Sequence, residues 1–198
     1  MSSLFDHSRV PIQRTKRTPG DAYYTPQVLA DALVSLLPLI PGETVMEPSA
    51  GGGAFVRSLI ERQGLGCVHA MDIDAGSPGL GMVYAAHSTA GDFLELRTGG
   101  GVLGPDWVVG NPPYNQAEAH VRQSIDVTHR HVALLLRLAF LEGAKRIPLW
   151  RDHPCRKVWV LSQRPSFTGK GTDSAAYGWF WWDSQHEGPT EMEVFSWR

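Results

Sequence analysis

The sequence has few cysteines, no excess of positive charge and no long apolar run. Its two cysteines, Cys67 and Cys155, match neither a metal-ligand spacing nor a disulfide framework, so we expect small buried apolar roles in a reducing compartment. The 18 lysines and arginines are outnumbered by 20 aspartates and glutamates. This balance excludes a uniformly basic surface and confines any contact with nucleic acid to local patches.

The sequence shows neither an export signal nor a membrane-spanning segment. Residues 1–10 lack a basic-then-apolar signal, and no apolar run approaches the roughly 18 residues of a membrane span. We therefore expect a soluble cytoplasmic protein with no membrane contact, either a monomer or a homodimer. The 198 residues are 42% hydrophobic, which suits one well-formed core.

Apolar periodicity predicts alternating strands and helices. Helices are expected from Thr25-Pro26 to Pro38, with Thr25 as N-cap, from about 54 to 62, and at 117–128. Strands are expected at 44–47, 67–72, 82–86, 107–109, 132–140, 157–162 and 177–182, with a further edge strand near 192–197. The last two long strands should pair antiparallel. The pattern indicates an α/β fold with a doubly wound sheet of about seven strands.

The amino-terminal segment 1–22 has little periodicity and carries Arg9, Arg14, Lys16 and Arg17. Two interpretations stay open: a solvated tail, or an arm that contacts phosphates and becomes ordered on nucleic acid. We expect a mobile arm over 1–22 and a single domain over 23–198.

The stretch DWVVGNPPYN places Asn111, Pro112, Pro113 and Tyr114 at the carboxyl end of a buried strand. The prolines end the strand, and ligands of open α/β sheets bind at that edge. Asn111 can accept through its side-chain oxygen, Pro112 offers a rigid carbonyl, and Tyr114 can stack on a ring. The group suits an amino group on a heteroaromatic base, although Pro-Pro alone is more often only a turn.

A second signal is EPSAGGGAF, residues 47–55. Its consecutive glycines follow a strand and precede an amphipathic helix, which lets the backbone approach a ligand closely. A dinucleotide dehydrogenase spaces its glycines and carries an acid about 20 residues further on. Here the glycines are contiguous and follow Glu47-Pro48, so that class is disfavoured.

Taken in order, these segments resemble the motifs of gamma-group N6-adenine DNA methyltransferases. YYTP resembles motif X, EPSAGGGAF motif I, AMDID motif II, GDF motif III and NPPY motif IV, over about residues 22–183. SFTGKGTDSA, WFWW and the short chain resemble small phage- or prophage-type enzymes. Restriction-type gamma enzymes usually add a large carboxyl-terminal target-recognition domain. We expect no separate domain of this kind here, and recognition by loops, the arm or a partner.

The resemblance implies a Rossmann-like class I methyltransferase fold, S-adenosylmethionine as cofactor, and methyl transfer to N6 of adenine in DNA by base flipping. It implies that Thr25 and Glu47 hold the methionine end, Asp72 the ribose hydroxyls and Asp92 the cofactor's adenine, with Phe93 against that ring. The whole cofactor set is Tyr24, Thr25, Glu47, Ser49, Ala50, Gly51, Asp72, Ile73, Asp92, Phe93 and Asn111. No metal is expected. Taken singly, each acid could equally be a solvated strand end.

On the substrate side, Asn111, Pro112, Pro113 and Tyr114 form the expected catalytic group. Tyr114 and Phe167 are expected to sandwich the flipped base, although Phe167 could instead be a hydrophobic plug under a loop. Arg164 and Lys170 flank Phe167, and they are expected to contact the duplex together with Arg14, Lys16 and Arg17 of the arm.

Three rival functions stay open. An RNA adenine methyltransferase uses the same motifs. A protein glutamine methyltransferase also presents NPPY to a planar amide, but that family resembles D-x-G-x-G at motif I and carries a helical amino-terminal domain, neither of which is present. A non-catalytic nucleic-acid adaptor is expected to have lost motif I or motif IV, and both are intact here.

Overall fold

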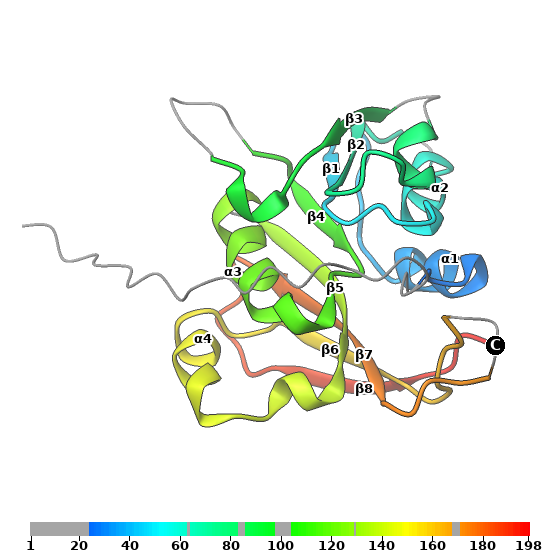
Figure 1. Cartoon of the computed structure of the whole chain (residues 1–198). Helices are drawn as coiled ribbons and strands as arrows, with labels where there is room; N and C mark the ends of the chain where they lie inside the picture. The colour runs from blue at the N-terminus through cyan, green and yellow to red at the C-terminus, as the bar shows by residue number, and fades with distance from the viewer. Residues whose placement is uncertain (1–23, 63, 83–85, 98–103, 129, 168–170) are drawn as a thin grey trace, which may run out of the picture.

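The computed structural model describes residues 24–62, 64–82, 86–97, 104–128, 130–167 and 171–198. Over this part of the chain it is a mixed sheet of eight strands: β1 Thr44–Glu47, β2 Cys67–Asp72, β3 Ala86–Ala90, β4 Trp107–Gly110, β5 His131–Arg137, β6 Lys157–Leu161, β7 Tyr177–Asp183 and β8 Glu191–Phe195. Their order is β3-β2-β1-β4-β5-β7-β6-β8, with β7 antiparallel to both of its neighbours. The expected doubly wound α/β sheet and its antiparallel pair are confirmed (Figure 1). The edge strand expected near 192–197 is β8, so the sheet has eight strands where about seven were expected.

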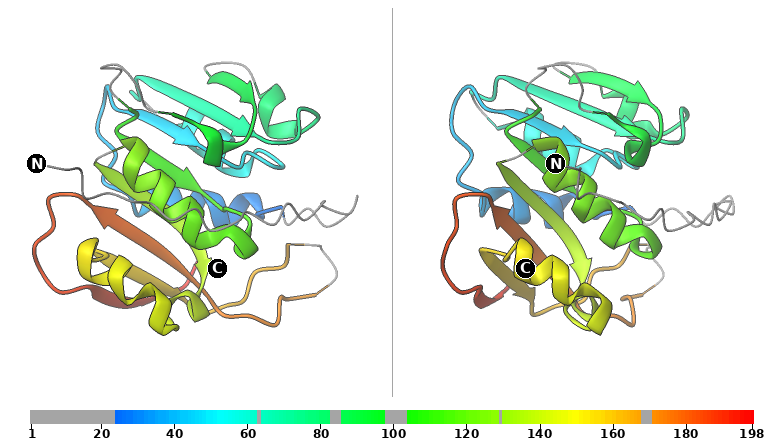
Figure 2. Two further views of the ribbon diagram at one scale, coloured as in Figure 1. Left: turned by 60° about the vertical axis from the view of Figure 1, so that its left-hand side comes forward. Right: turned by 90° about the vertical axis from the view of Figure 1, so that its left-hand side faces the viewer.

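Helices lie on both faces of this sheet (Figure 2). The α-helices are α1 Gln27–Ser35, α2 Ala54–Ile60, α3 Ala117–Thr128 and α4 Ile147–Asp152, and the 3-10 helices are η1 Pro78–Gly81, η2 Phe93–Glu95, η3 Tyr114–Gln116, η4 Leu138–Leu141 and η5 Ala144–Arg146. Residues of α1 and α2 share one buried cluster with Trp107 and Trp179. Residues of α3 and α4 share a second cluster with Phe180 and Trp182. The aromatic run of β7 therefore serves both faces, because successive strand residues point to opposite sides.

The third strand was expected at 82–86 but occupies Ala86–Ala90. Met82, which supplied the apolar signal, packs instead with the cluster formed by Ala50, Val56 and Ala70. The true strand reads AHSTA, and residues 87–90 are exposed. Because β3 pairs only with β2 at the edge of the sheet, it needs no apolar face of its own.

Thr25 was expected to cap the first helix, and this was wrong. The helix begins at Gln27 after Pro26, with no side-chain cap. The Thr25 hydroxyl oxygen instead accepts a hydrogen bond from Asn111 Nδ2 at 3.1 Å. A contact between residues so far apart in sequence has no local signature, so capping statistics could not reveal it.

The fifth strand was expected to run through Phe140, but β5 ends at Arg137 and the chain turns into η4. Most other boundaries agree with the sequence pattern, and α3 covers the expected 117–128. Cys155 is buried, as expected, whereas Cys67 is only partly buried. The Cys155 thiol donates to the Trp181 carbonyl at 3.1 Å. Burial raises the pKa of this thiol to about 12.

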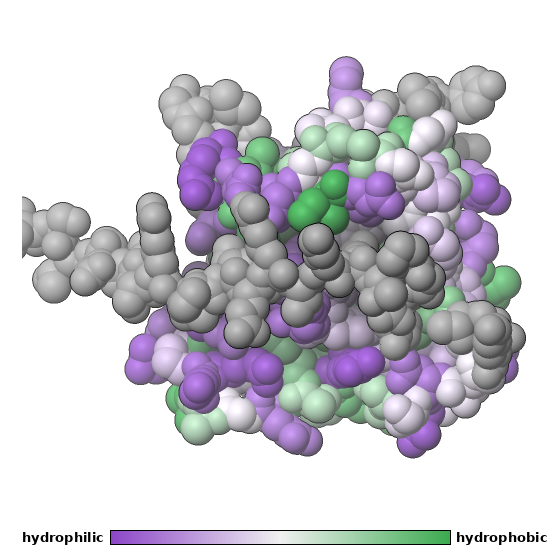
Figure 3. Space-filling view, viewed as in Figure 1, coloured by the Kyte–Doolittle hydropathy of each residue, from purple (hydrophilic) through white to green (hydrophobic). Residues whose placement is uncertain are grey.

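The surface is mostly hydrophilic on the face seen in Figure 3, where apolar residues form small separate patches. The exposed large apolar side chains include Val28, Ile73, Ile147 and Val194, which lie on four different elements or loops. Among the described segments, no helix has the length and apolar character needed to cross a bilayer.

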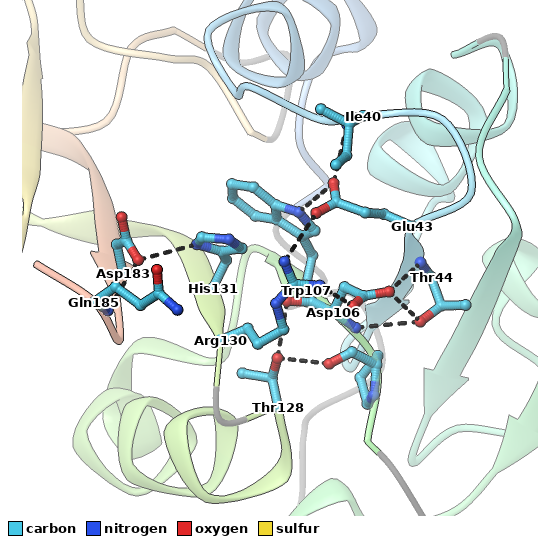
Figure 4. A network of polar contacts seen from close by, with 11 residues as sticks. Ile40, Glu43, Thr44, Asp106, Trp107, Thr128, Arg130, His131, Asp183 and Gln185 are labelled. Atoms are coloured by element: carbon cyan, nitrogen blue, oxygen red, sulfur yellow. Dashed lines mark hydrogen bonds and ion pairs between the residues drawn. The ribbon is translucent and has the colours of Figure 1, made fainter.

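A polar network joins strand starts at the amino-terminal edge of the sheet (Figure 4). Asp106 Oδ2 accepts from the Thr44 amide at 2.8 Å and from its hydroxyl at 3.0 Å. The buried carboxylate of Glu43 accepts from Trp107 Nε1 at 2.8 Å. Arg130 pairs with both acids, so β1, β4 and β5 are tied together away from the edge that carries the sequence motifs.

His131 belongs to the same network and should make stability depend on pH. Its ring stacks on Trp107 with centroids 4.3 Å apart, and Nδ1 lies 3.6 Å from Asp183 Oδ1. Burial lowers the pKa of His131, although the nearby Asp183 opposes this. Because the unfolded chain binds the proton more readily, the contribution of His131 to the free energy of unfolding should fall as pH drops below about 6.5, by at most about 1.4 kcal/mol per pH unit.

Urea unfolding of the wild type and of His131→Gln between pH 5 and 7.5 measures this contribution. The free energy of unfolding of the wild type minus that of His131→Gln should fall as the pH drops from 7.5 to 5, whereas the exposed control His153→Gln should keep the wild-type slope. Equal slopes in the wild type and His131→Gln would show that His131 does not titrate with folding.

Candidate functional site

The reversal of strand order between β1 and β4 creates the candidate site. The chain moves outward from β1 to β2 and β3, then returns to place β4 on the other side of β1. Ligands of such sheets bind at the carboxyl ends of the strands beside this switch point. Glu47 ends β1 and Asn111 directly follows β4, so the topology brings EPSAGGG and NPPY together.

Asn111 has one half of its amide bound and the other half available. Its Nδ2 donates to Thr25, whereas Oδ1 is buried and accepts no hydrogen bond from the described residues. A buried acceptor without a partner is unusual and costs stability. Oδ1 is therefore prepared to accept a hydrogen bond from a ligand.

Glu47 is a buried acid whose only hydrogen-bond donor in the described chain is close in sequence. The side chain is 1% exposed, and Oε1 accepts from the Ser49 amide at 2.9 Å. Burial, opposed by that hydrogen bond and helped by the charge of Asp72, raises its pKa to about 8. Without a cationic partner the group is thus mostly protonated at neutral pH.

Gly110 is required by this carboxyl group. A Cβ atom at position 110 would collide with both carboxyl oxygens of Glu47. Any other residue at the end of β4 would push Glu47 out of its place or separate β1 from β4, so the glycine before NPPY serves the packing of the site.

The glycine loop has a backbone that most residues cannot adopt. Gly51 and Gly53 have φ values of 49° and 84°, and a Cβ on Gly52 would lie 3.0 Å from the Tyr24 ring. The loop is held by Asp72, whose Oδ2 accepts from the Gly51 amide at 2.8 Å. Tyr24, Thr25, Glu47, Ser49, Ala50, Gly51 and Asn111, all expected at the cofactor site, line one small pocket here.

The remaining expected cofactor residues follow β2 and β3 and do not line that pocket. Asp72 is buried and also accepts from the Asp74 amide at 2.9 Å, whereas Ile73 is exposed. Asp92 caps η2 by accepting from Leu94, and Phe93 is buried with its ring 5.6 Å from that of His120. A carboxylate offers about four acceptor sites, so Asp72 and Asp92 keep capacity for a ligand.

Tyr114 lies in an aromatic group at the same edge. Its ring centroid is 5.4 Å from that of Tyr177 and 6.3 Å from that of Phe167. Phe167 is only 6% exposed and packs edge-on against Tyr177. The planes of Tyr114 and Phe167 are inclined by 58°, so the arrangement fits the plug interpretation, and the base sandwich stays a prediction.

Most of the basic residues expected to contact the duplex lie outside the described residues. Arg164 is exposed three residues after β6, near Phe167 in sequence. Lys170 and the arm residues Arg9, Arg14, Lys16 and Arg17 lie outside the described residues. Their contacts with nucleic acid therefore stay predictions.

Two features of the site were missed. Gly110 stands directly before NPPY, but only the position of Glu47 explains it. Arg137 ends β5 with its Cζ 4.8 Å from the centroid of the Tyr114 ring. A single cation inside the apolar run VALLLRLAF was a signal that could have identified it.

The titratable groups of the described residues form no metal-binding cluster. Among the residues that the structure describes, no three histidine, cysteine, aspartate or glutamate side chains cluster so as to hold an ion.

No protein-family model and no curated protein matches the chain. Solved structures do. A protein from Pyrococcus horikoshii, assigned as an RNA methyltransferase, has a TM-score of 0.67 at 14% identity, covering 86% of this chain and 91% of that one. The modification subunit assigned to a type I restriction enzyme from Vibrio vulnificus has a TM-score of 0.64 at 16% identity, covering 85% and 45%.

A dimethyladenosine transferase from Plasmodium falciparum is also similar, with a TM-score of 0.59 at 14% identity over 81% of this chain and 62% of that one. At such identities the likeness concerns the fold. The chain has the Rossmann-like fold of class I methyltransferases.

Proposed function

We propose that the chain binds S-adenosylmethionine at the switch point and transfers its methyl group to the exocyclic N6 of adenine in DNA. The observation that carries this proposal is the buried, unpartnered Oδ1 of Asn111 beside the glycine-loop pocket. An acceptor in that position recognises an N–H donor, and NPPY supplies a second acceptor one residue later in the Pro112 carbonyl.

The residues of the pocket fit the proposed cofactor. The bent glycine backbone allows close approach of a ligand. Glu47 and Thr25 suit the methionine end, since a buried carboxyl group gains from a cationic partner such as an ammonium. Tyr24 lies over the loop as an aromatic cover. When bound, the cofactor supplies an activated methyl group attached to a sulfonium sulfur.

The chain contributes positioning and electrostatics to the transfer. The amino lone pair of adenine is delocalised into the ring, so an external base gives little help. If Asn111 Oδ1 and the Pro112 carbonyl accept the two amino protons, the nitrogen moves toward tetrahedral geometry and its lone pair is directed at the methyl group. Fixed acceptors of this kind stabilise the positive charge that develops on nitrogen.

Access to a base in a duplex requires flipping, which costs a few kcal/mol that stacking in the pocket offsets. Tyr114 offers one ring face for this. Phe167 is proposed as the second, and the inclined rings must then move apart when the base enters. RNA is the second candidate substrate, because solved structures with this fold include proteins named as an RNA methyltransferase and a 23S rRNA methyltransferase.

Transfer of a tritiated methyl group from S-adenosylmethionine to mixed-sequence duplex DNA, total RNA and unfolded protein, assayed in parallel, tests the substrate class. We expect acid-insoluble label that deoxyribonuclease releases. Label released only by ribonuclease would assign RNA instead. Label in protein alone would overturn the proposal.

A further inference from the structure

Arg137 is a cation at the carboxyl edge of the sheet, beside the proposed target base. It is the last residue of β5, which runs parallel to β4, and NPPY follows β4 directly. Its Cζ lies 4.8 Å from the centroid of the Tyr114 ring. A guanidinium group at this distance from an aromatic ring is attracted to its face.

Most of the donor capacity of this guanidinium is unused. Its Nε donates to the Tyr177 hydroxyl in a long hydrogen bond of 3.4 Å. In the part of the chain that the structure describes, no carboxylate lies within ion-pair distance of Arg137. Other arginines with charged partners there include Arg122, Arg130, Arg146, Arg151 and Arg156.

Arg137 is a permanent cation whose geometry suits an anion. The hydrogen bond to Tyr177 and, to a smaller extent, the charge of Asp173 raise the pKa of Arg137 against the effect of burial, so the group stays protonated. Arg137 is half-buried and is held by its contact with Tyr114 and its hydrogen bond to Tyr177, whereas its Nη atoms have no hydrogen-bond partner among the described residues. A planar fork with free donors matches the oxygens of a phosphate in a bidentate way.

We propose that Arg137 binds a backbone phosphate adjacent to the flipped adenine while stacked on Tyr114. The proposal rests on the proposed function and names the phosphodiester as part of what the site recognises. One side chain then couples the position of the backbone to the position of the ring that receives the base. A planar amide on a protein lacks this anion and should be a poor substrate.

The experiment uses a duplex oligonucleotide containing the mapped target adenine, with a normal or a methylphosphonate linkage on either side of it. The methylphosphonate removes one charge from the nucleic acid, and Arg137→Gln removes one from the protein. If the two charges interact, either change alone should raise KM roughly tenfold to hundredfold. Combining Arg137→Gln with the methylphosphonate should raise KM little further. The salt slope of binding should fall by about one unit in Arg137→Gln.

Two further variants separate charge from fold. Arg137→Lys keeps the charge without the planar fork, so it should retain the salt slope and recover only part of the affinity. Arg151→Gln, an exposed arginine paired with Asp152 on α4, should behave like the wild type. Thermal melting of each variant reports whether it is folded.

Undiminished sensitivity of Arg137→Gln to the methylphosphonate would overturn the phosphate contact. So would a lower kcat with unchanged KM and salt slope, because that pattern belongs to a residue that only supports Tyr114. If the wild type methylates no nucleic acid at all, the proposed function fails, and the role of Arg137 fails with it.

Discussion

Replacing Asn111 by alanine should remove methyl transfer and leave cofactor affinity almost unchanged. The substitution deletes the buried acceptor Oδ1 and the donor to Thr25. Loss of one preorganised partner of a developing charge typically lowers kcat by about 10²–10³. The substitution also removes a buried acceptor that has no partner. The free energy of unfolding of the variant should therefore be at most about 1 kcal/mol below that of the wild type.

Single-turnover rates with saturating cofactor, together with cofactor affinity from calorimetry, measure both parts. The matched control is Gln185→Ala, which removes an amide from the opposite edge of the sheet (Figure 4). It should keep the wild-type rate. Full activity in Asn111→Ala would contradict the role given to NPPY, whereas loss of cofactor binding would move Asn111 from the reaction to the cofactor pocket.

Glu47→Gln should weaken cofactor binding and remove most of its pH dependence. An ammonium group binds the ionised carboxylate, but the pKa of Glu47 is about 8 without a ligand. Cofactor affinity should therefore rise by about tenfold per pH unit up to pH 8, where the ligand amine itself, with a pKa of about 7.7–8.0, begins to lose its proton. The neutral glutamine should bind roughly tenfold to hundredfold more weakly at pH 8 and show little change between pH 6 and 7.

The same substitution should stabilise the protein in the absence of ligand. A carboxyl group whose folded pKa is raised contributes stability that is fully present below the unfolded value of 4.5 and is lost as the pH rises toward about 8. At pH 7 this loss is on the order of 3 kcal/mol. Glu47→Gln avoids ionisation, so its stability should change much less over that range.

Calorimetric titration with the cofactor and urea unfolding without it, both from pH 5 to 8.5, test this pair of effects. Glu61→Gln, which changes an exposed glutamate at the end of α2, is the control and should match the wild type in both. If cofactor affinity depends on pH as strongly in Glu47→Gln as in the wild type, a group other than Glu47 loses the proton when the cofactor binds.

The positions of NPPY and the glycine loop could be predicted because both depend on local rules. Prolines end β4, glycines permit the turn after β1, and alternation of strands with helices implies that both turns meet at one edge. What each side chain does at that edge depends on tertiary contacts. Thr25 looked like a helix cap and instead binds Asn111.

Other parts of the site were hidden for the same physical reason. Gly110 has no visible purpose until the carboxyl group of Glu47 is placed beside it. Arg137 looks like an interruption of an apolar strand until β5 is paired with β4 and the ring of Tyr114 lies next to it. Phe167 was expected to stack on a flipped base or to plug a loop, and the sequence could not decide between the two because burial in a loop has no periodic signal. In the structure Phe167 is buried against Tyr177.

The most direct test of methyl transfer to adenine N6 is to identify the atom that carries the new methyl group. Duplex DNA is incubated with the wild type and S-adenosylmethionine bearing a deuterated methyl group, then digested to nucleosides and analysed by mass spectrometry. We expect the deuterium in N6-methyldeoxyadenosine, and at least about a hundredfold less of it in the same time with Asn111→Ala. Deuterium confined to methylated cytosine, or to protein, would contradict the assignment of the site to adenine.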